Sequence, residues 1–472
     1  MKKMILKVVL ILSFLPLATA WGQSPVAIAV DLKAAGRTIP DDFSGLSFEM
    51  ENILPRWNES SFFTSHLFRP DNKPLIQLFK TLGIKNLRLG GGSADEKTVG
   101  FIGNSEIDSL FAFAKAADVK VIYTLRLRDG DLKREAQMAE YIEAHYPDQL
   151  DCFAIGNEPD VYFTTNYPAF RVAWKKYADA IIAAAPGAKF CGPGGGIPYA
   201  KAFVDDFGKS GFVKCVTWHE YPGGFGPGTD GAVGREHMLS PEWLNTYQKL
   251  YHSTIPPAFP DTLPNRLEEA NNFWGGGAEN VSDTFASALW AVDYLYWWAG
   301  HGSGGINFHT GDFIPGSSRP FQYEAFLPLG HKGYDIHPLS YGMKTFDIGR
   351  HGNVLPLTIT NVGKINLTAY AVRSADKNLF VTIINKEHDA GARAAQVTIA
   401  AGENISGAQV ISLVAPHSDV AVKTGETLGG ASINADGSWN GNWSVAPVPP
   451  PGSPFALQVP AASAVVVRLS FE

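Results

Sequence analysis

Cysteine is scarce in this 472-residue chain, which contains only Cys152, Cys191 and Cys215. Each lies inside a short apolar run, and a sparse, odd set does not form a disulfide framework. We interpret the three as small buried side chains in strands rather than as a thiol nucleophile or a metal cluster. Histidine pairs with metal-ligand spacing are also lacking, so we predict neither a metal ion nor a cofactor.

Charged residues are few as well, at 18% of the chain, and they sum to a formal net charge of −7. No run rich in Lys or Arg is present, so the sequence lacks the electrostatic signature of a protein that binds nucleic acid or an anionic membrane. The length and the 45% hydrophobic content predict a globular protein with one large domain and one smaller domain. We expect a monomer.

Long apolar runs are confined to the N-terminus. Met1-Lys2-Lys3 supplies positive charge, Val8 to Leu17 is apolar, and Ala18-Thr19-Ala20 has the small residues of a cleavage site. A buried helix is the poorer interpretation because Pro16 interrupts the run. The sequence therefore predicts a signal peptide over residues 1–20 and a secreted or periplasmic protein that leaves the membrane once the signal is removed. No later segment approaches the roughly 18 uninterrupted apolar residues of a membrane helix.

From residue 43 onward, short apolar runs alternate with helical patterns, as in βα units around a parallel sheet. The expected strands are Phe43–Phe48, Asn86–Leu89, Lys120–Thr124, Cys152–Ile155, Lys189–Cys191, Lys214–Trp218, Asn265–Leu267 and Gly305–Phe308. Helix starts are readable between them, for example at Ser105, Ser240 and Ser282. These repeats predict an α/β fold, a (β/α)8 TIM barrel over residues 41–350.

The pattern changes after residue 350, where alternating or β-branched runs are separated by Gly, Asn and Asp. The expected strands are Val354–Asn361, Ile365–Arg373, Leu379–Asn385, Ala394–Ala400, Gln409–Leu413 and Ser463–Phe471. They predict a C-terminal all-β sandwich domain over residues 351–472. Residues 21–40 contain a further run, Val26–Val30, which we expect to add an edge strand to that domain.

The expected strand Cys152–Ile155 ends in Gly156-Asn157-Glu158-Pro159. Strand ends at the C-terminal face of a barrel carry the chemistry, so Asn157 and Glu158 there indicate sugar binding and proton transfer. Taken alone, the motif fits an ordinary turn about as well, because Gly, Asn and Pro are turn formers.

A glycosidase needs a second carboxylate, about 5–5.5 Å from the first if the configuration is retained. Asn265–Leu267 leads into Glu268 and Glu269. Because successive strand residues point to opposite faces, we expect only one of them to aim at the barrel axis. The pattern does not choose between them, and a solvated pair of acids is the structural alternative.

Polar residues also end other expected strands, and they form the candidate substrate-binding set of Glu49, Arg88, His219, Tyr221 and His309. Tyr221 could donate a hydrogen bond to the nucleophile and keep it ionised. Structural roles are open alternatives: Arg88 could pair with Glu49 or Glu158, and His219 could be a satisfied buried imidazole.

Six motifs in this order along the chain resemble landmarks of glycoside hydrolase family 79, the family of β-glucuronidases and heparanases. They are Phe43-Ser44-Gly45-Leu46-Ser47-Phe48-Glu49, Leu87-Arg88-Leu89-Gly90-Gly91, Gly156-Asn157-Glu158-Pro159-Asp160, Glu269-Ala270-Asn271, Ser282-Asp283-Thr284-Phe285-Ala286-Ser287-Ala288-Leu289-Trp290 and Asn307-Phe308-His309.

This resemblance implies a retaining mechanism with Glu158 as acid/base and Glu269 as nucleophile, since the family's pattern of Glu, any residue and Asn selects Glu269 over Glu268. It also implies that Asn157 holds the sugar 2-hydroxyl. Glu158 must then carry a proton at the start and act as a base after the glycosyl-enzyme forms. The implied substrate is a glucuronide or a glycosaminoglycan-like oligosaccharide, cleaved by an exo-acting β-glucuronidase.

Two segments depart from the family pattern. Gly92 stands where the family usually has Asn, and Leu125-Arg126-Leu127-Arg128-Asp129 replaces an amide-bearing segment. These changes leave the sugar undetermined, and we expect Tyr323 and Tyr334, with Lys332 nearby, to meet a uronate carboxylate. An endo-acting heparanase-like hydrolase, a β-glycosidase for another sugar and a non-catalytic carbohydrate-binding barrel are the alternatives. Net acidity counts against the first, and the paired carboxylates count against the last.

Overall fold

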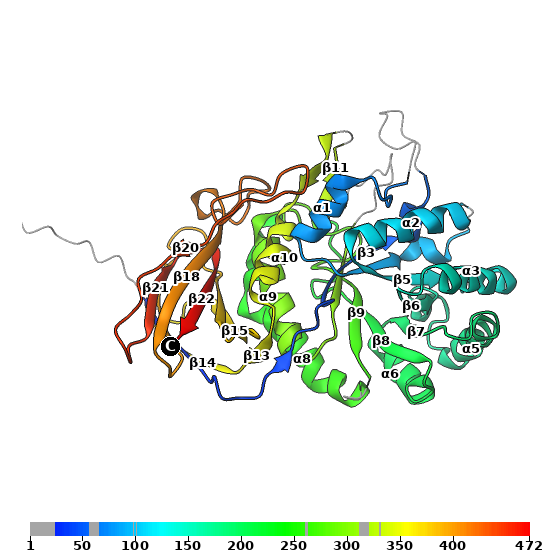
Figure 1. Ribbon diagram of the computed structural model, residues 1–472, viewed down its shortest axis with the longest axis horizontal. Coiled ribbons are helices and arrows are strands. Elements are labelled where there is room, and N and C mark those ends of the chain that lie inside the picture. Colours follow the sequence, from blue (N-terminus) through cyan, green and yellow to red (C-terminus); the bar gives the residue numbers. More distant parts are fainter. Residues whose placement is uncertain are drawn as a thin grey trace, which may run out of the picture.

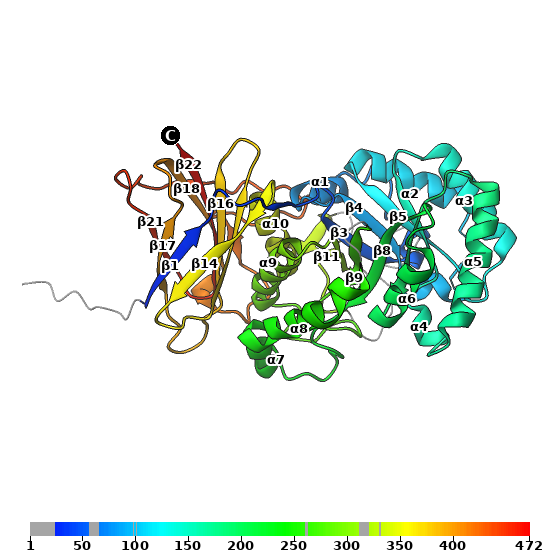
Figure 2. The same ribbon diagram turned by 90° about the horizontal axis from the view of Figure 1, so that it is seen from below.

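The computed structural model describes residues 24–55, 66–97, 99–100, 102–259, 263–310, 321–329 and 332–472. The expected signal peptide, residues 1–20, lies outside them. An α/β barrel and an all-β domain lie side by side, with α9 (Phe285–Gly300) and α10 (Pro338–Gly349) between them (Figure 1, Figure 2). Within the described residues, none of the helices is both long enough and apolar enough to cross a membrane.

Eight parallel strands close into a barrel, as the alternating sequence pattern predicted. They are β3 (Ser44–Glu49), β4 (Asn86–Gly90), β5 (Lys120–Leu125), β6 (Leu150–Ile155), β7 (Phe190–Gly195), β8 (Val213–Glu220), β9 (Asn265–Ala270) and β10 (Ile306–His309). Helices cover the outside, so strands such as β4 are buried along their whole length.

Each barrel strand is followed by a helix that returns the chain to the opposite end of the barrel. The larger helices before α9 are α1 (Lys73–Thr81), α2 (Asn104–Ala117), α3 (Leu132–His145), α5 (Tyr167–Ala184), α6 (Ile197–Phe207), α7 (Gly231–Leu239) and α8 (Pro241–Ala258). The expected start of α8 is present, because the Ser240 hydroxyl accepts a hydrogen bond from Trp243 N at 3.2 Å. Every loop between a strand and its following helix therefore lies at one end of the barrel.

The three cysteines lie in neighbouring barrel strands β6, β7 and β8 and are unpaired. Burial raises the pKa of all three thiols. They therefore act as small buried side chains, as the sequence indicated.

The all-β domain is a sandwich of two sheets. One sheet has the order β14-β1-β17-β21, and the other contains β19, β18, β22, β16, β15, β13 and β2 with β20 at its side. The strands are β1 (Ser24–Val30), β2 (Arg37–Thr38), β13 (Asn353–Leu355), β14 (Leu357–Asn361), β15 (Leu367–Arg373), β16 (Leu379–Asn385), β17 (Ala395–Ala400), β18 (Ile405–Val414), β19 (Thr427–Leu428), β20 (Ser444–Val445), β21 (Phe455–Val459) and β22 (Ser463–Phe471).

Two expectations for this domain were wrong. The N-terminal strand β1 is internal, because it pairs with β14 on one side and with β17 on the other. The single strand expected over Val354–Asn361 is two strands in different sheets. They are separated by Pro356, which has no N–H to donate to a ladder and interrupts the strand there.

The larger sheet of the sandwich packs on α9 and α10, so the two lobes share one hydrophobic cluster. A buried ion pair crosses this contact, with Lys386 Nζ 2.8 Å from Asp293 Oδ2. Tyr370 and Thr368 donate hydroxyl hydrogen bonds to the other Asp293 oxygen at 2.6 and 2.8 Å. Because a buried carboxylate is stable only when it is paired and hydrogen-bonded, this cluster requires the two lobes to dock in one arrangement.

Candidate active site

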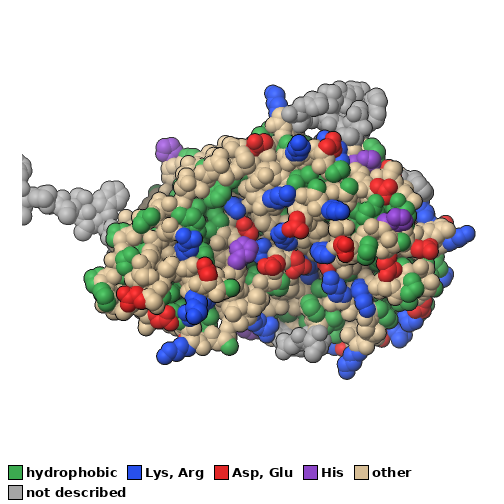
Figure 3. Space-filling view, viewed as in Figure 1, with side chains coloured by type: hydrophobic (Ala, Val, Ile, Leu, Met, Phe, Trp, Pro, Cys, Tyr) green, Lys and Arg blue, Asp and Glu red, His purple; other side chains and the backbone are tan. Residues whose placement is uncertain are grey.

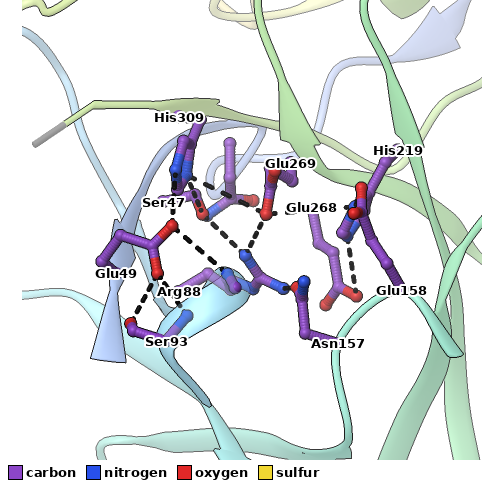
Figure 4. Close-up of polar contacts among 12 residues, drawn as sticks. Ser47, Glu49, Arg88, Ser93, Asn157, Glu158, His219, Glu268, Glu269 and His309 are labelled. Carbon is purple, nitrogen blue, oxygen red and sulfur yellow. Dashed lines mark hydrogen bonds and ion pairs between the residues drawn. The ribbon is translucent and has the colours of Figure 1, made fainter. Parts of the chain in front are cut away.

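A cleft of about 760 Å³ opens at the C-terminal end of the barrel strands. Most of the polar residues that the sequence singled out line it or lie directly beneath it, and Figure 4 shows how they converge. The cleft-lining set includes Glu49, Asn157, Glu158, His219, Tyr221, Glu269, His309 and Tyr323.

Glu158 follows the end of β6 and occupies the N-cap position of the short helix α4 (Pro159–Tyr162) without a side-chain capping hydrogen bond. Its backbone is in the left-handed region, with φ of 44°, and its N–H donates to Gly194 O at 2.7 Å. Gly156 has φ of 81°, and a Cβ there would lie 2.8 Å from the Tyr162 hydroxyl. A non-glycine residue with positive φ, such as Glu158, is uncommon and keeps that conformation only where its surroundings enforce it. The turn thus presents the Glu158 carboxyl to the cleft, where the side chain is 39% exposed.

Glu269 lies at the end of β9, and its carboxylate is held from two sides. Arg88 Nη1 lies 2.6 Å from Oε2, and the Tyr221 hydroxyl donates to Oε1 at 2.8 Å. Burial alone would raise the pKa of Glu269, but the charges of His309, His219 and Arg88 and the Tyr221 hydrogen bond lower it well below the usual range. Glu269 is therefore an ionised, fixed carboxylate, and the expected Tyr221 contact is present.

Arg88 lies beneath the cleft and is fully buried. Besides Glu269, it donates to Ser47 Oγ at 3.0 Å and, through Nη2, to Asn157 Oδ1 at 2.6 Å. Glu49 and Glu158 were the structural partners expected for Arg88, whereas its ion pair is with Glu269. Since Arg88 occupies the Asn157 amide oxygen, the amide NH₂ group is left to face the cleft.

Glu268 and Glu269 both approach His219, at 3.7 Å from Nε2 and 3.9 Å from Nδ1 respectively. The expectation that only one of them aims inward was wrong. In the pairing of β8 with β9, Trp218 lies opposite Leu267 and His219 lies opposite Glu269, so Glu268 is the extra residue of a β-bulge. A bulge breaks the alternation of side chains and turns both carboxylates toward the barrel interior.

His219 connects these acids to Glu158, whose Oε1 lies 3.0 Å from His219 Nδ1. Burial lowers the pKa of His219, but the charge of Glu269, the hydrogen bond to Glu158 and the nearby Glu268 carboxylate raise it to about 10. Glu268 is fully buried, and its pKa is lowered because His219 and Arg88 outweigh the effect of burial. His219 is therefore a buried cation among three carboxyl groups, rather than a neutral packing residue.

A second polar cluster forms the wall at the ends of β3 and β10. Glu49 accepts hydrogen bonds from Ser93 N at 2.8 Å and Ser93 Oγ at 2.5 Å, and His309 Nε2 lies 3.4 Å from it. Burial lowers the pKa of His309, but Glu269 and Glu49 raise it overall. Burial raises the pKa of Glu49, but His309 and Ser93 lower it overall. The wall thus presents fixed, charged hydrogen-bonding groups to a ligand (Figure 4).

The two tyrosines expected after the last barrel strand separate in the structure. Tyr323 lines the cleft, with its ring centroid 5.9 Å from that of His309. Tyr334 lies in β12 (Tyr334–Ile336), is buried, and accepts a hydrogen bond from Asn72 Nδ2 at 2.9 Å. Tyr334 and Lys332 are not among the residues that line the cleft, so Tyr334 is a structural residue and its assignment to the site was wrong.

Asp95 supports the site and was not selected from the sequence. Its carboxylate accepts hydrogen bonds from the N–H groups of Asn157 at 2.8 Å and of Leu127 and Arg128 at 2.9 Å. It thereby fixes the loop after β6 to the loop after β5. The position of Asp95 at the end of the Gly-rich segment after β4 could have indicated a role in the site. An acidic residue after glycines is, however, also common in ordinary turns.

The two segments that depart from the family pattern are placed differently from each other. Arg126 donates to the carbonyl oxygens of Ala94 and Glu96, and Arg128 lies over the Tyr162 ring at 5.6 Å. Both added cations are thus used within the loops. Gly92 does line the cleft, and a Cβ there would meet nothing within 4 Å, so its lack of a side chain enlarges the site.

Glu158, His219 and Glu269 each offer one ligand atom within 4.8 Å of the others, which is a spacing that a metal could use. Both Glu269 oxygens already accept hydrogen bonds from Arg88 and Tyr221, and His219 Nδ1 is bonded to Glu158. A cation there would be added to a group that already contains Arg88, so the arrangement suits proton transfer better than metal binding.

The same spacing bears on covalent chemistry, because it places a Glu158 oxygen within 4.8 Å of a Glu269 oxygen. Carboxyl groups about 5–5.5 Å apart act as acid/base and nucleophile, whereas separations of roughly 6.5–9.5 Å leave room for an inverting water. The spacing of Glu158 and Glu269 is therefore that of a carboxyl pair which could act as acid/base and nucleophile in a double displacement.

Comparison with curated proteins finds a relative of part of the chain. Over 215 residues the chain is 26% identical to heparanase from Rattus norvegicus, a match that covers 40% of this chain and 38% of heparanase. The chain resembles heparanase. This confirms the resemblance to glycoside hydrolase family 79 that the six motifs indicated. The match spans well under half of the heparanase chain, and no family model matches this sequence.

Solved structures share the whole architecture at low identity. A 4-O-α-L-rhamnosyl-β-D-glucuronidase from Fusarium oxysporum superposes with a TM-score of 0.66 at 16% identity, covering 93% of this chain and 99% of its own. An α-L-arabinofuranosidase from Thermotoga maritima gives 0.66 at 15% identity, covering 94% and 99%. These similarities establish the fold, a closed parallel barrel with an attached β-domain.

Proposed function

We propose that this protein is a retaining glycoside hydrolase, an exo-acting β-glucuronidase that removes terminal β-linked glucuronic acid. The observation that carries the proposal is the pairing of Glu158 with Glu269 within 4.8 Å, with Glu269 held ionised by its cationic neighbours. The similarity to rat heparanase supports a glycosidase of this kind.

In the first step Glu269 attacks the anomeric carbon while Glu158 protonates the leaving oxygen, so the glycosidic bond breaks as the glycosyl-enzyme ester forms. In the second step Glu158 takes a proton from water, which attacks the same carbon and releases Glu269. Arg88 and Tyr221 orient the nucleophile throughout. The Asn157 NH₂ group, held by Arg88 through the amide oxygen, donates to the 2-hydroxyl.

The charge of the cleft favours one small anion over a polyanionic chain. Among the described residues that line the cleft, none is Lys or Arg. Acidic and basic side chains are interspersed on the face that Figure 3 shows, without a broad basic area. Tyr323 and His309, whose pKa is raised by Glu269 and Glu49, are the groups that would meet a single uronate carboxylate. An endo-acting hydrolase for sulfated chains would need a groove of basic side chains, so it is the second candidate.

The test is hydrolysis of p-nitrophenyl β-D-glucuronide beside the matching glucoside, galactoside and xyloside, with Glu269→Ala as the control. Hydrolysis of the glucuronide alone, lost in the variant, is the expected result. Hydrolysis of another glycoside alone would contradict the sugar, and full activity of the variant would contradict the nucleophile. We also propose, from residues 1–20, that the enzyme acts outside the cytoplasm, which fractionation of expressing cells would show.

A further inference from the structure

Two aromatic side chains lie exposed at the rim of the cleft and take no part in the chemistry described above. Among the described residues, Phe225 and Trp274 are the aromatic members of the exposed large hydrophobic side chains, at 53% and 50% exposure. Both line the cleft that contains Glu158 and Glu269. An exposed aromatic pair gives up the free energy of burial, and at the edge of a polar cleft such a pair is typical of a ligand contact.

The pair is built rigidly before any ligand arrives. Phe225 is in the loop after β8 and Trp274 is in the loop after β9, and these loops are joined by Gly226 N to Trp274 O at 2.9 Å and Trp274 N to Gly224 O at 2.8 Å. The ring centroids are 4.6 Å apart. A Cβ on Gly275 would lie 2.6 Å from the Phe225 ring, so the glycine permits this close approach. A preorganised surface loses little entropy when it binds.

The cleft is lined by both polar and apolar side chains. The hydroxyl groups of a bound sugar need polar partners, which Asn157, Glu49 and His309 supply. The exposed Val161 lies in α4, which begins directly after Glu158, so a further apolar side chain belongs to the same segment as the proton donor. Val161, Phe225 and Trp274 line the same cleft as Glu158. Because the hydroxyl groups of the glycone require the polar partners, the apolar side chains remain for the leaving group, whose oxygen Glu158 must touch.

We propose that Phe225 and Trp274 form a stacking subsite for the leaving group, which takes a ligand with a flat apolar face. An aromatic aglycone or the apolar face of a pyranose ring has that chemistry. This inference rests on the proposed hydrolase function and extends it to the part of the substrate beyond the cleaved bond.

The subsite acts in only one of the two chemical steps. While the bond from the anomeric carbon to the leaving oxygen breaks and the proton of Glu158 moves to that oxygen, the leaving group stacks on the pair. It has departed when water attacks the glycosyl-enzyme. Loss of the rings therefore slows formation of the glycosyl-enzyme and leaves its hydrolysis unchanged.

The experiment compares leaving groups in Phe225→Ala, Trp274→Ala and the double variant. Values of kcat/KM are measured for p-nitrophenyl β-D-glucuronide, for a β-glucuronyl disaccharide and for β-D-glucuronyl fluoride, whose leaving group has no face to stack. We expect a loss of roughly tenfold for each single variant on the first two substrates. On the fluoride we expect less than a twofold change. Val233→Ala, which removes an apolar side chain on α7 that is 67% exposed, is the matched control.

A loss of kcat/KM on the aryl glucuronide alone assigns the subsite to aromatic aglycones. A loss on both the aryl glucuronide and the disaccharide assigns it to flat faces in general. Equal losses on the fluoride, or no loss on any substrate, would overturn the proposal. A binding measurement tests the subsite separately from the proposed hydrolase function. The wild type and Trp274→Ala are titrated with p-nitrophenyl β-D-glucuronide in a calorimeter, and this measurement does not depend on turnover. Binding that weakens in the variant while the wild type hydrolyses nothing would overturn the hydrolase and support the subsite, and unchanged binding would overturn the subsite.

Discussion

Arg88 and Glu269 form a buried ion pair, 2.6 Å from Nη1 to Oε2, in which the same guanidinium also holds Asn157. One cation thus fixes the proposed nucleophile relative to the residue proposed to hold the sugar 2-hydroxyl. Because the Arg88 side chain is fully buried, its removal leaves Glu269 and Asn157 without this buried partner.

Arg88→Met should lower kcat and shift the acidic limb of kcat/KM to higher pH. Arg88 is one of the charges that lower the pKa of Glu269, and activity requires this carboxylate to be ionised. Breaking a buried pair also destabilises the protein by about 3–5 kcal/mol. Arg88→Lys keeps the charge but cannot bond Glu269 and Asn157 as one planar fork, so it should restore the acidic limb better than kcat. An unshifted limb in Arg88→Met would contradict the electrostatic role.

Glu268→Gln and Glu269→Gln form a matched pair of neutralising changes at adjacent positions. Glu269→Gln should reduce kcat by more than about a thousandfold, because it removes the proposed nucleophile. Glu268→Gln should retain activity to within about tenfold, because Glu268 is fully buried and its nearest cation is His219, 3.7 Å away. The measurement is the steady-state kcat of both variants on the same aryl glycoside. The reverse order of the two losses would exchange the assigned roles.

His219 should make the stability of the protein depend on pH. Its pKa of about 10 lies above the value of about 6.5 expected in the unfolded chain. A raised pKa contributes stability that is fully present below the unfolded value and is lost as pH rises through the folded value. The melting temperature of the wild type should therefore exceed that of His219→Gln most at pH 6, and the difference should narrow toward pH 10. Exposed His145→Gln is the control, and a constant difference would contradict a buried cation.

Lys386→Met should weaken the contact between the barrel and the β-domain. It leaves Asp293 buried with hydroxyl donors only, which should destabilise the protein by about 3 kcal/mol. Lys386→Met combined with Asp293→Asn should recover part of that loss, because no charge is then left unpaired. Denaturant unfolding followed by tryptophan fluorescence measures both variants. Exposed Lys249→Met on α8 should have little effect, and an equal loss there would contradict the role of the pair.

The barrel could be predicted because its signal is local. Short apolar runs and helical patterns recur along the chain, and the expected strands match the structure to within a few residues at most ends. The carboxyl ends of β7, β8 and β9 extend further than expected, since β7 continues past Cys191 to Gly195 and the other two include Glu220 and Glu268. Polar residues at the end of a strand are predicted to be loop residues when only the sequence is considered. Here their partners are buried groups from distant segments, such as the Tyr294 hydroxyl that donates to Glu220.

The remaining features depend on pairing between strands, which one strand's sequence does not contain. The bulge that turns both Glu268 and Glu269 inward is a shift in register against β8. Tyr334 follows the last barrel strand in sequence, yet its hydroxyl is bonded to Asn72 at the start of α1. The Phe225–Trp274 pair was missed for the same reason, because its two residues come from different loops that are brought together only by the fold.

The internal position of β1 has a consequence for the order of assembly. Val26 pairs with Asn361 and with Val397, so the strand lies between two partners that come from the last quarter of the chain. During synthesis from the N-terminus, all eight barrel strands are made before either partner exists. The first described strand therefore lacks its partners until β14 and then β17 have been made, and closing so long a loop is slow compared with forming local contacts. Insertion of β1 between β14 and β17 is then a late event, which ties the beginning of the chain to its end.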